Sequence, residues 1–209
     1  MNDTSTLIAR KLLQINAIKL SPQKPFVWAS GLKSPIYCDN RLTLSYPEVR
    51  KLIIDGFVSA IKEQDFDIIG GIATAGIPHG AILAEKLEKP FIYVRSKAKA
   101  HGKQNKIEGV LPQGAKVIMV EDLISTGMSS LAAVDAIREG GGLVNTVLSI
   151  FNYGFKISKD SFDTKKCTFV SLCTYDILLK EAVQLGFIEQ EQLAILSDWN
   201  KDPENWSYN

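Results

Sequence analysis

This chain contains little cysteine and histidine, and it has no long hydrophobic run. Of its 209 residues, three are cysteines and two are histidines. Cys38, Cys167 and Cys173 lie far apart without a CxxC pair, which is typical of reduced thiols rather than of a disulfide framework or a zinc site. The N-terminus lacks the apolar block of a signal peptide, and no apolar run reaches membrane-spanning length. We therefore expect a cytoplasmic protein.

An excess of charge of either sign is also absent. The formal net charge is +1, from 24 basic and 23 acidic residues. This balance gives no general attraction to nucleic acids or acidic membranes, so any preference for anions must come from a local cluster. The hydrophobic share of 45% is that of an ordinary globular protein. The length allows a single domain with a sizeable core.

Apolar strands alternate with amphipathic helices over most of the chain. The predicted strands are 67–71, 90–94, 117–120, 143–151 and 167–172, and the predicted helices are 7–15, 45–61, 77–87, 130–138, 175–185 and 191–196. Residues 20–44 are less regular, and Ser45-Tyr-Pro-Glu48 matches a capping box. The alternation predicts a parallel sheet with helices on both faces. Ligands of such sheets bind beyond the carboxyl ends of the strands, so the turns after Gly71, Val94 and Val120 should share that edge.

The clearest candidate site follows the strand 117–120. Two acids, Glu121 and Asp122, come directly after it, and a turn of small residues leads into the next helix. This turn contains Ser125, Thr126, Gly127, Ser129 and Ser130. Backbone N–H groups and hydroxyls of such a turn can surround a phosphate, whereas paired carboxylates suit a vicinal diol or a hard cation. The combination predicts a ribose 5-phosphate site, and its spacing fits neither a Walker A loop nor a dinucleotide fingerprint.

The segment 117–130, VIMVEDLISTGMSS, resembles the phosphoribosyl-diphosphate (PRPP) signature of the type I phosphoribosyltransferases. The resemblance implies an α/β fold with a central, mostly parallel sheet flanked by helices, and a small hood formed mainly by the N-terminal segment. It also implies that Glu121 and Asp122 hold the ribose hydroxyls. The PRPP contacts implied in this segment are Glu121, Asp122, Leu123, Ile124, Ser125, Thr126, Gly127, Met128 and Ser129.

A basic segment follows the strand 90–94. It carries Arg95, Lys97, Lys99, Lys103 and Lys106 without an acid or much apolar surface. In isolation such a charge run is most often a solvated loop. At the ligand edge of a sheet, we expect it to be mobile and to close over a polyanion.

Arg95, Lys99, His101 and Gly102 match the catalytic loop of the orotate branch of the same family. The resemblance makes Arg95, Lys99 and His101 the catalytic and PRPP-binding candidates. His101 could stabilise charge or donate a proton, with charge stabilisation favoured. Some members carry a second Lys directly after the Arg, where this chain has Ser96; whether Lys97 substitutes for it stays open.

A glycine-rich turn over 70–80 resembles the pyrophosphate loop of the family. The implied PRPP contacts there are Ala73, Thr74, Ala75 and Gly76, which would bind through their backbone because Ala75 stands where some members carry Lys. His79 is expected to pack or to cap a helix.

Residues 26–41 resemble the hood of orotate enzymes, with Ala29 where some members carry Lys. Tyr37 is a candidate to stack on the base, and Ser125 is expected near it. Many orotate enzymes place an Arg for the substrate carboxylate after the strand that ends near Phe151, but this chain has no basic residue there before Lys156. Recognition of the carboxylate is then left to backbone amides, Ser125 or the hood.

The resemblance implies transfer of the phosphoribosyl group of PRPP to orotate, giving orotidine 5'-monophosphate and diphosphate in pyrimidine synthesis. It further implies Mg²⁺ carried by PRPP, with no direct protein ligand and only water-mediated contact to the acids, and a homodimer that shares its active-site loop. One domain is expected, with the hood and N-terminal helix at about 1–44, the α/β core at about 45–175 and a C-terminal helical segment at about 176–209. Open alternatives are a phosphoribosyltransferase for a purine or uracil, and a ligand-sensing regulator on the same fold.

Overall fold

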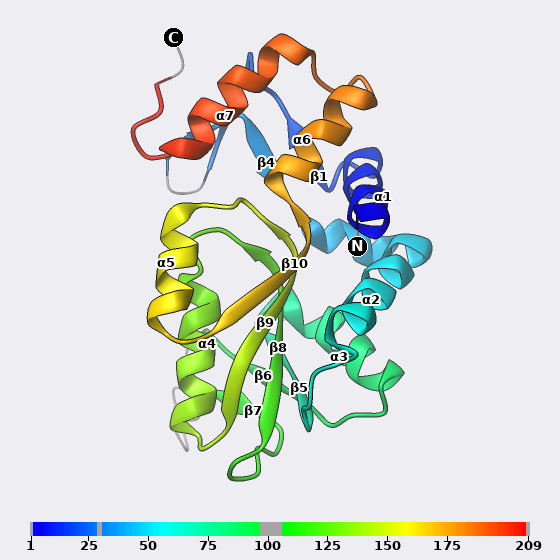
Figure 1. Ribbon diagram of the computed structural model, residues 1–209, viewed down its shortest axis with the longest axis vertical. Coiled ribbons are helices and arrows are strands. Elements are labelled where there is room, and N and C mark those ends of the chain that lie inside the picture. Colours follow the sequence, from blue (N-terminus) through cyan, green and yellow to red (C-terminus); the bar gives the residue numbers. More distant parts are fainter. Residues whose placement is uncertain (1, 29–30, 97–105, 208–209) are drawn as a thin grey trace.

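The computed structural model describes residues 2–28, 31–96 and 106–207. Within them a six-stranded sheet has the order β10-β9-β8-β5-β6-β7 (Figure 1). Its strands are β5 (Ile68–Ile72), β6 (Phe91–Val94), β7 (Ile107–Glu108), β8 (Lys116–Ile124), β9 (Leu143–Asn152) and β10 (Thr168–Thr174). All pairings are parallel except β6 with β7, which is antiparallel. The predicted, mostly parallel sheet is confirmed.

Helices cover both faces of this sheet, as the apolar strands require (Figure 1). The described helices are α1 (Asn2–Gln14), α2 (Pro47–Ile61), α3 (Gly76–Lys86), α4 (Met128–Glu139), α5 (Lys156–Thr164), α6 (Tyr175–Gln184) and α7 (Leu193–Lys201), with the short η2 (Gln190–Gln192) before α7. Buried side chains of α1, α2, α3 and α6 form one core with one face of β8 and β9. Those of α4 and α5 form a second core on the opposite face.

The central strand β8 is longer than predicted. The sequence suggested that it ends at Val120, but it continues through Glu121 and Asp122 to Ile124. The reason is the neighbouring strand β9, whose residues pair in register as far as Ile124 with Asn152. The two acids therefore lie inside a strand of the sheet and not in the loop behind it.

Local signals misplaced the starts of two helices and missed two further elements. The predicted capping box at Ser45 is wrong, because Ser45 ends the 3₁₀ helix η1 (Asn40–Ser45) and Tyr46 is the N-cap of α2, without a side-chain cap bond. Helix α4 begins at Met128, two residues before the predicted start. The helix α5 and the two-residue strand β7 were not predicted, since α5 is mostly polar and β7 is short.

The hood comprises residues 18–45. Strand β1 (Ile18–Leu20) pairs antiparallel with β4 (Ile36–Cys38), β2 (Phe26–Val27) pairs antiparallel with β3 (Lys33–Ser34), and η1 follows. An aromatic cluster joins the hood to the C-terminal helix: the ring of Trp28 lies 5.8 Å from those of Tyr153 and Trp199. The hood and α7 thus meet at one end of the molecule (Figure 1). No described helix is long and apolar enough to cross a membrane.

Candidate active site

The two acids of β8 lie at the carboxyl edge of the sheet, with Glu121 buried and Asp122 half-buried. Glu121 is 6% exposed and accepts a hydrogen bond from the Ser129 hydroxyl in the first turn of α4. Burial, and then the neighbouring Asp122 carboxylate, raise the pKa of Glu121 to about 9. Burial also raises the pKa of Asp122. Two adjacent carboxylates that are shielded from water lose hydration and repel each other when both are ionised. The pair therefore retains a proton near neutrality.

Asp122 is held against the hood. The Asn40 side-chain amide donates to the Asp122 carbonyl over 2.8 Å. The nearby Arg41 guanidinium lowers the pKa of the Asp122 carboxyl, whereas Asp39 raises it. The hood therefore meets the main sheet at the residue predicted to hold the ribose.

The predicted phosphate turn is short and tight. Residues 125–127 form bends between β8 and α4, and Gly127 takes φ +83° as the N-cap of α4. No side chain of the described residues caps the helix there, so first-turn N–H groups remain available for an anion. The Ser130 hydroxyl is buried and has no partner among the described residues.

The predicted pyrophosphate loop follows β5 and packs on β8. Ala73 N donates to Val94 O over 2.9 Å, and the Ala73–Thr74 peptide bond is cis. A Cβ added at Gly76 would lie 2.2 Å from the Val120 carbonyl oxygen, so only glycine allows α3 to approach the strand there. This approach places the loop directly beside Glu121.

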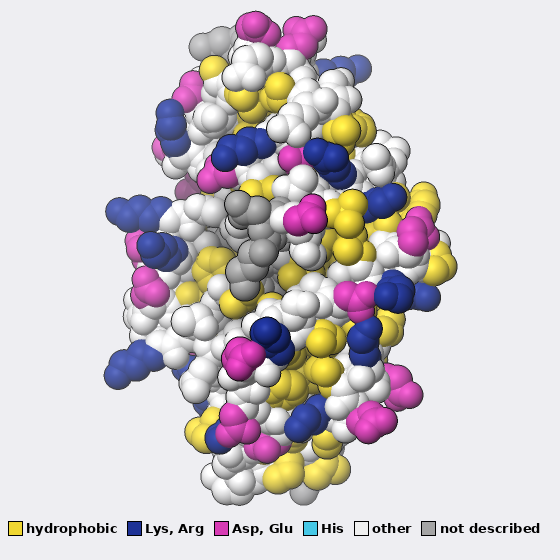
Figure 2. Space-filling model, turned by 45° about the vertical axis from the view of Figure 1, so that its right-hand side comes forward, with side chains coloured by type: hydrophobic (Ala, Val, Ile, Leu, Met, Phe, Trp, Pro, Cys, Tyr) yellow, Lys and Arg dark blue, Asp and Glu magenta, His cyan; other side chains and the backbone are white. Residues whose placement is uncertain are grey.

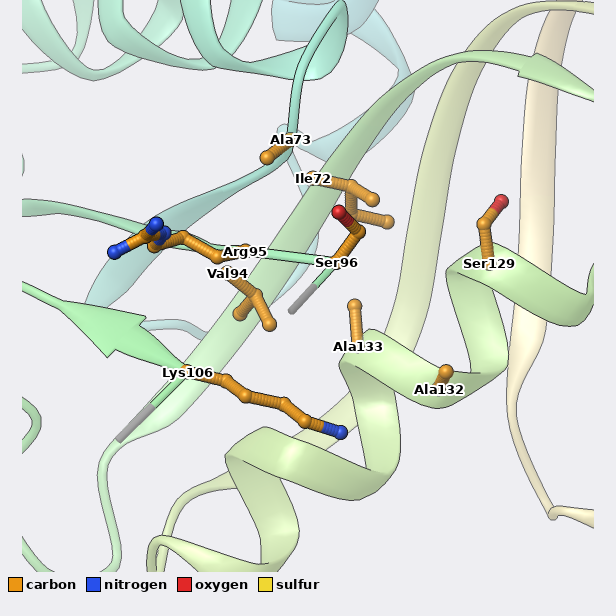
Figure 3. A pocket seen from close by; sticks show the side chains of 9 residues that line it. All are labelled: Ile72, Ala73, Val94, Arg95, Ser96, Lys106, Ser129, Ala132 and Ala133. Carbon is orange, nitrogen blue, oxygen red and sulfur yellow. The ribbon is translucent and has the colours of Figure 1, made fainter. Parts of the chain in front are cut away.

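One pocket of about 120 Å³ lies between the turns after β5 and β6 and the first half of α4 (Figure 3). It is lined by Ile72, Ala73, Val94, Arg95, Ser96, Lys106, Ser129, Ala132 and Ala133. These residues come from the ends of β5 and β6 and the residues just after them, from Lys106 just before β7, and from α4. The prediction that these turns share one edge of the sheet is confirmed.

Comparison with known proteins agrees with this geometry. The model of the phosphoribosyl transferase domain matches residues 43–184. An orotate phosphoribosyltransferase of Cytophaga hutchinsonii is 52% identical over 201 residues, covering 95% of this chain and 96% of its own length. The chain belongs to the orotate phosphoribosyltransferase family. A Bacteroides thetaiotaomicron relative of the same name is 49% identical over 99% of this chain and 98% of its own length. The crystal structure of an orotate phosphoribosyltransferase from Aeropyrum pernix has a TM-score of 0.76 at 28% identity, covering 87% of this chain and 99% of its own.

Arg95, a catalytic candidate of the family loop, does not face the pocket centre in this structure. Its guanidinium is turned away from α4 (Figure 3) and its Nη1 lies 3.4 Å from Oε1 of Glu108 on β7. The Lys106 side chain extends instead toward α4 (Figure 3). The other loop candidates of the family motif, Lys97, Lys99, His101, Gly102 and Lys103, lie outside the described residues.

The base-binding candidates lie on the hood side of β8. Tyr37 is 40% exposed, with its ring 5.8 Å from that of Phe26. Ser125 and Thr126 do not line the first pocket but a second cleft of about 260 Å³ beside Trp28 and α7. Of the predicted contacts, Ala73, Arg95 and Ser129 thus line the first pocket, and Ser125 and Thr126 line the second cleft.

His79 packs in the interior and lines neither of the two pockets described above. It is fully buried, and burial lowers its pKa to about 4. The Thr43 hydroxyl donates to Asn40 O over 2.6 Å, so in its 3.4 Å contact with His79 Nε2 the ring N–H donates. The expectation that His79 packs is confirmed.

Sequence reasoning missed Asn40 and Glu108, which position the acids and Arg95 respectively. Both contacts join separate elements, and the one between Asn40 and Asp122 spans 82 residues of the sequence.

Within the described residues, no group of three or more His, Cys, Asp or Glu side chains could hold a metal ion. The carboxylate oxygens of Glu121 and Asp122 are of the kind that Mg²⁺ prefers.

Gly127 is expected to tolerate alanine less well than Gly114. Both take a left-handed backbone, at φ +83° and +77°, but an added Cβ at Gly127 would lie 2.8 Å from the Phe162 ring, whereas Gly114 faces open space. Gly114→Ala should cost about 1–2 kcal/mol from backbone strain alone. Gly127→Ala should cost a further 1–3 kcal/mol, roughly, from overpacking. Urea unfolding of both variants measures this difference, and equal losses would contradict it.

Without ligand, the protein should lose stability as pH rises. The loss should occur over the pH range in which Glu121 is protonated in the folded state but ionised in the unfolded state. The unfolded chain ionises this group near pH 4.5, whereas the folded chain retains the proton up to about pH 9. The folded state then binds more protons, so stability falls with pH in this window. Glu121→Gln removes the effect and should be more stable than wild type by roughly 1–3 kcal/mol at pH 7.

Thermal unfolding from pH 4 to pH 8 tests this expectation. The advantage of Glu121→Gln should be small at pH 4 and grow toward pH 8. The exposed Glu63→Gln is the matched control and should show no such trend. A constant difference between Glu121→Gln and wild type would refute the assignment.

Proposed function

We propose that this chain transfers the phosphoribosyl group of PRPP to orotate, giving orotidine 5'-monophosphate and diphosphate in pyrimidine synthesis. One observation carries the proposal beyond family membership. A buried and a half-buried acid on β8 lie beside both a phosphate-type turn and a glycine-rich loop, at the carboxyl edge of a parallel sheet. Such a site accommodates a ribose that bears phosphate at one end and diphosphate at the other.

The acid pair would hold the ribose hydroxyls. Because the pair shares a proton when the site is empty, it can both accept from and donate to a diol. The Ser129 hydroxyl fixes Glu121, and Asn40 fixes the backbone of Asp122. Leu123 and Ile124 would contribute backbone only, and residues 125–129 would bind the 5'-phosphate through N–H groups and hydroxyls.

Diphosphate departure would be assisted mainly by charge. The ribose carbon C1' develops cationic character as the leaving group departs, and orotate is already an anion that needs little activation. Preorganised cations around the leaving group should therefore contribute most to the rate. The candidates are Arg95, Lys99 and His101, with Ala73 to Gly76 offering backbone amides. To do so, Arg95 would have to break its ion pair with Glu108 and bind the diphosphate instead.

Mg²⁺ bound to the diphosphate would supply further charge neutralisation. Glu121 and Asp122 would contact it through water, since two carboxylates are too few for a protein-made cage.

We further propose a homodimer in which each subunit's active-site loop serves the other subunit. We also propose a division into a hood and N-terminal helix at about 1–44, a core at about 45–175 and a C-terminal segment at about 176–209. A cytoplasmic location and the absence of nucleic-acid binding stay predictions. On the face shown in Figure 2, basic and acidic side chains are interspersed.

The activity is tested by the loss of orotate absorbance on addition of PRPP and Mg²⁺. Wild type should consume orotate and release diphosphate, and should use uracil, hypoxanthine and adenine far more slowly. Faster consumption of a purine than of orotate would identify that purine as the substrate instead. Absence of turnover together with salt-dependent binding of RNA or DNA would favour a regulator.

Loop sharing is tested by mixing two inactive variants. Lys99→Ala removes a loop cation, whereas Asp122→Asn removes a ribose contact in the sheet. If each active site combines the loop of one subunit with the sheet of the other, subunit exchange recreates about a quarter to a half of the wild-type sites. Orotate consumption by the mixture, with each variant alone as control, measures this. A mixture as inactive as its parts would show that each chain uses its own loop.

A further inference from the structure

The proposed substrate carries a charge for which the expected residue is missing. Strand β9 ends at Asn152, and Tyr153 to Phe155 carry no cation before Lys156. A carboxylate buried under a hood without a cationic partner would bind weakly. A cation from elsewhere in the fold is therefore required, and the chemistry of orotate restricts where it can lie.

Orotate bears its carboxylate on the ring carbon next to N1, the nitrogen that bonds to C1' of the ribose. C1' also neighbours the carbon that carries the 2'-hydroxyl. Rotation about the N1–C1' bond can turn the carboxylate toward the side of the ribose that carries the 2'-hydroxyl. A group that recognises it in this orientation lies beside the residues that hold the hydroxyls. In this chain those residues are the acids of β8, and the segment pinned directly on them is the start of η1.

This segment places a fixed guanidinium at the required position. Asn40 is fully buried and binds the Asp122 carbonyl over 2.8 Å, so the flanking residues Asp39 and Arg41 cannot move away from β8. Asp39 holds Arg41 side-on, with Nε–Oδ1 at 2.6 Å and Nη2–Oδ2 at 2.9 Å. The Arg41 side chain is nevertheless 64% exposed, so its remaining N–H groups are open to a ligand.

We propose that Arg41 is the residue that recognises the carboxylate of the pyrimidine substrate, with Asp39 as its positioning residue. The inference rests on the proposed function. A planar guanidinium held on one edge by Asp39 presents its free N–H groups to a second carboxylate, which is the geometry of bidentate recognition. Asp39 chiefly, and then Tyr37 and Asp122, raise the pKa of Arg41, which agrees with a position of its guanidinium near both the ribose acids and the candidate stacking ring.

The rival cation is Lys156, which lines the second cleft with Ser125. Its surroundings are less favourable, because Asp202 and Glu204 line the same cleft and their carboxylates would repel an anion. Lys156 is also exposed at the start of α5 and, among the described residues, has no partner that would fix it. Preorganisation therefore favours Arg41.

The test separates the two substrates of the reaction. Arg41→Ala should raise KM for orotate by about 30-fold or more, because a charge-assisted bidentate contact is lost. KM for PRPP should stay within about twofold of wild type. Arg41→Lys should recover only part of the loss, because an ammonium lacks the planar fork. Lys33→Ala, which removes an exposed cation of β3 in the same hood, is the matched control and should leave both constants unchanged.

Asp39→Asn tests the positioning role. It should raise KM for orotate less than Arg41→Ala does, and the two effects should not add in the double variant because Asp39 acts through Arg41. Full additivity would remove Asp39 from the proposal. Thermal unfolding of each variant controls for folding, and little change is expected at an exposed ion pair.

Three outcomes would overturn the inference about Arg41. The first is an unchanged KM for orotate in Arg41→Ala, and the second is a rise in KM for PRPP alone, which would assign Arg41 to the diphosphate. The third is a selective orotate defect in Lys156→Ala without one in Arg41→Ala. If wild type itself does not consume orotate, the proposed function fails before Arg41 is tested.

Discussion

The parallel pairing of β8 with β9 is the constraint on which the site depends. Backbone hydrogen bonds to β9 extend the central strand as far as Ile124, and so place Glu121 and Asp122 inside the sheet. A strand at this position is closed in by α3 on one side and by α4 on the other. Glu121 is therefore buried and Asp122 half-buried, and this loss of solvent raises the pKa of both carboxyls. Without the last residues of that pairing, the same side chains would lie in a solvated loop with ordinary chemistry.

Close backbone approach then assembles the remaining groups around the strand. Gly76 allows α3 to touch the Val120 carbonyl, and Gly127 allows the phosphate turn to pack against Phe162. Both glycines are needed for space, and Gly127 also for its left-handed backbone at φ +83°, which explains why small residues dominate the turns. The hood adds a third approach, through Asn40 and the Asp122 backbone. Three segments far apart in the chain thus converge on a few residues of one strand.

Most of the fold could be predicted from local sequence patterns. Strong apolar periodicity predicted the strands β5, β6, β8, β9 and β10 and the helices α1 to α4, α6 and α7, because buried faces leave a clear pattern. The polar helix α5 and the two-residue β7 left no such pattern. The capping box at Ser45 failed for a different reason: the preceding 3₁₀ helix already used Ser45. A local capping signal does not reveal the secondary structure of the residues that precede it.

For the candidate site, the sequence by itself determined which residue types could bind a phosphate, a diol and a polyanion, and the order in which they occur. That information is local, since it depends on chemistry within a few consecutive residues. Tertiary structure alone decided that Glu121 is buried enough to hold a proton, that Glu108 pairs with Arg95, and that Asn40 fixes the hood on Asp122. Burial and contacts between distant segments depend on how the whole chain packs, and no local pattern encodes them.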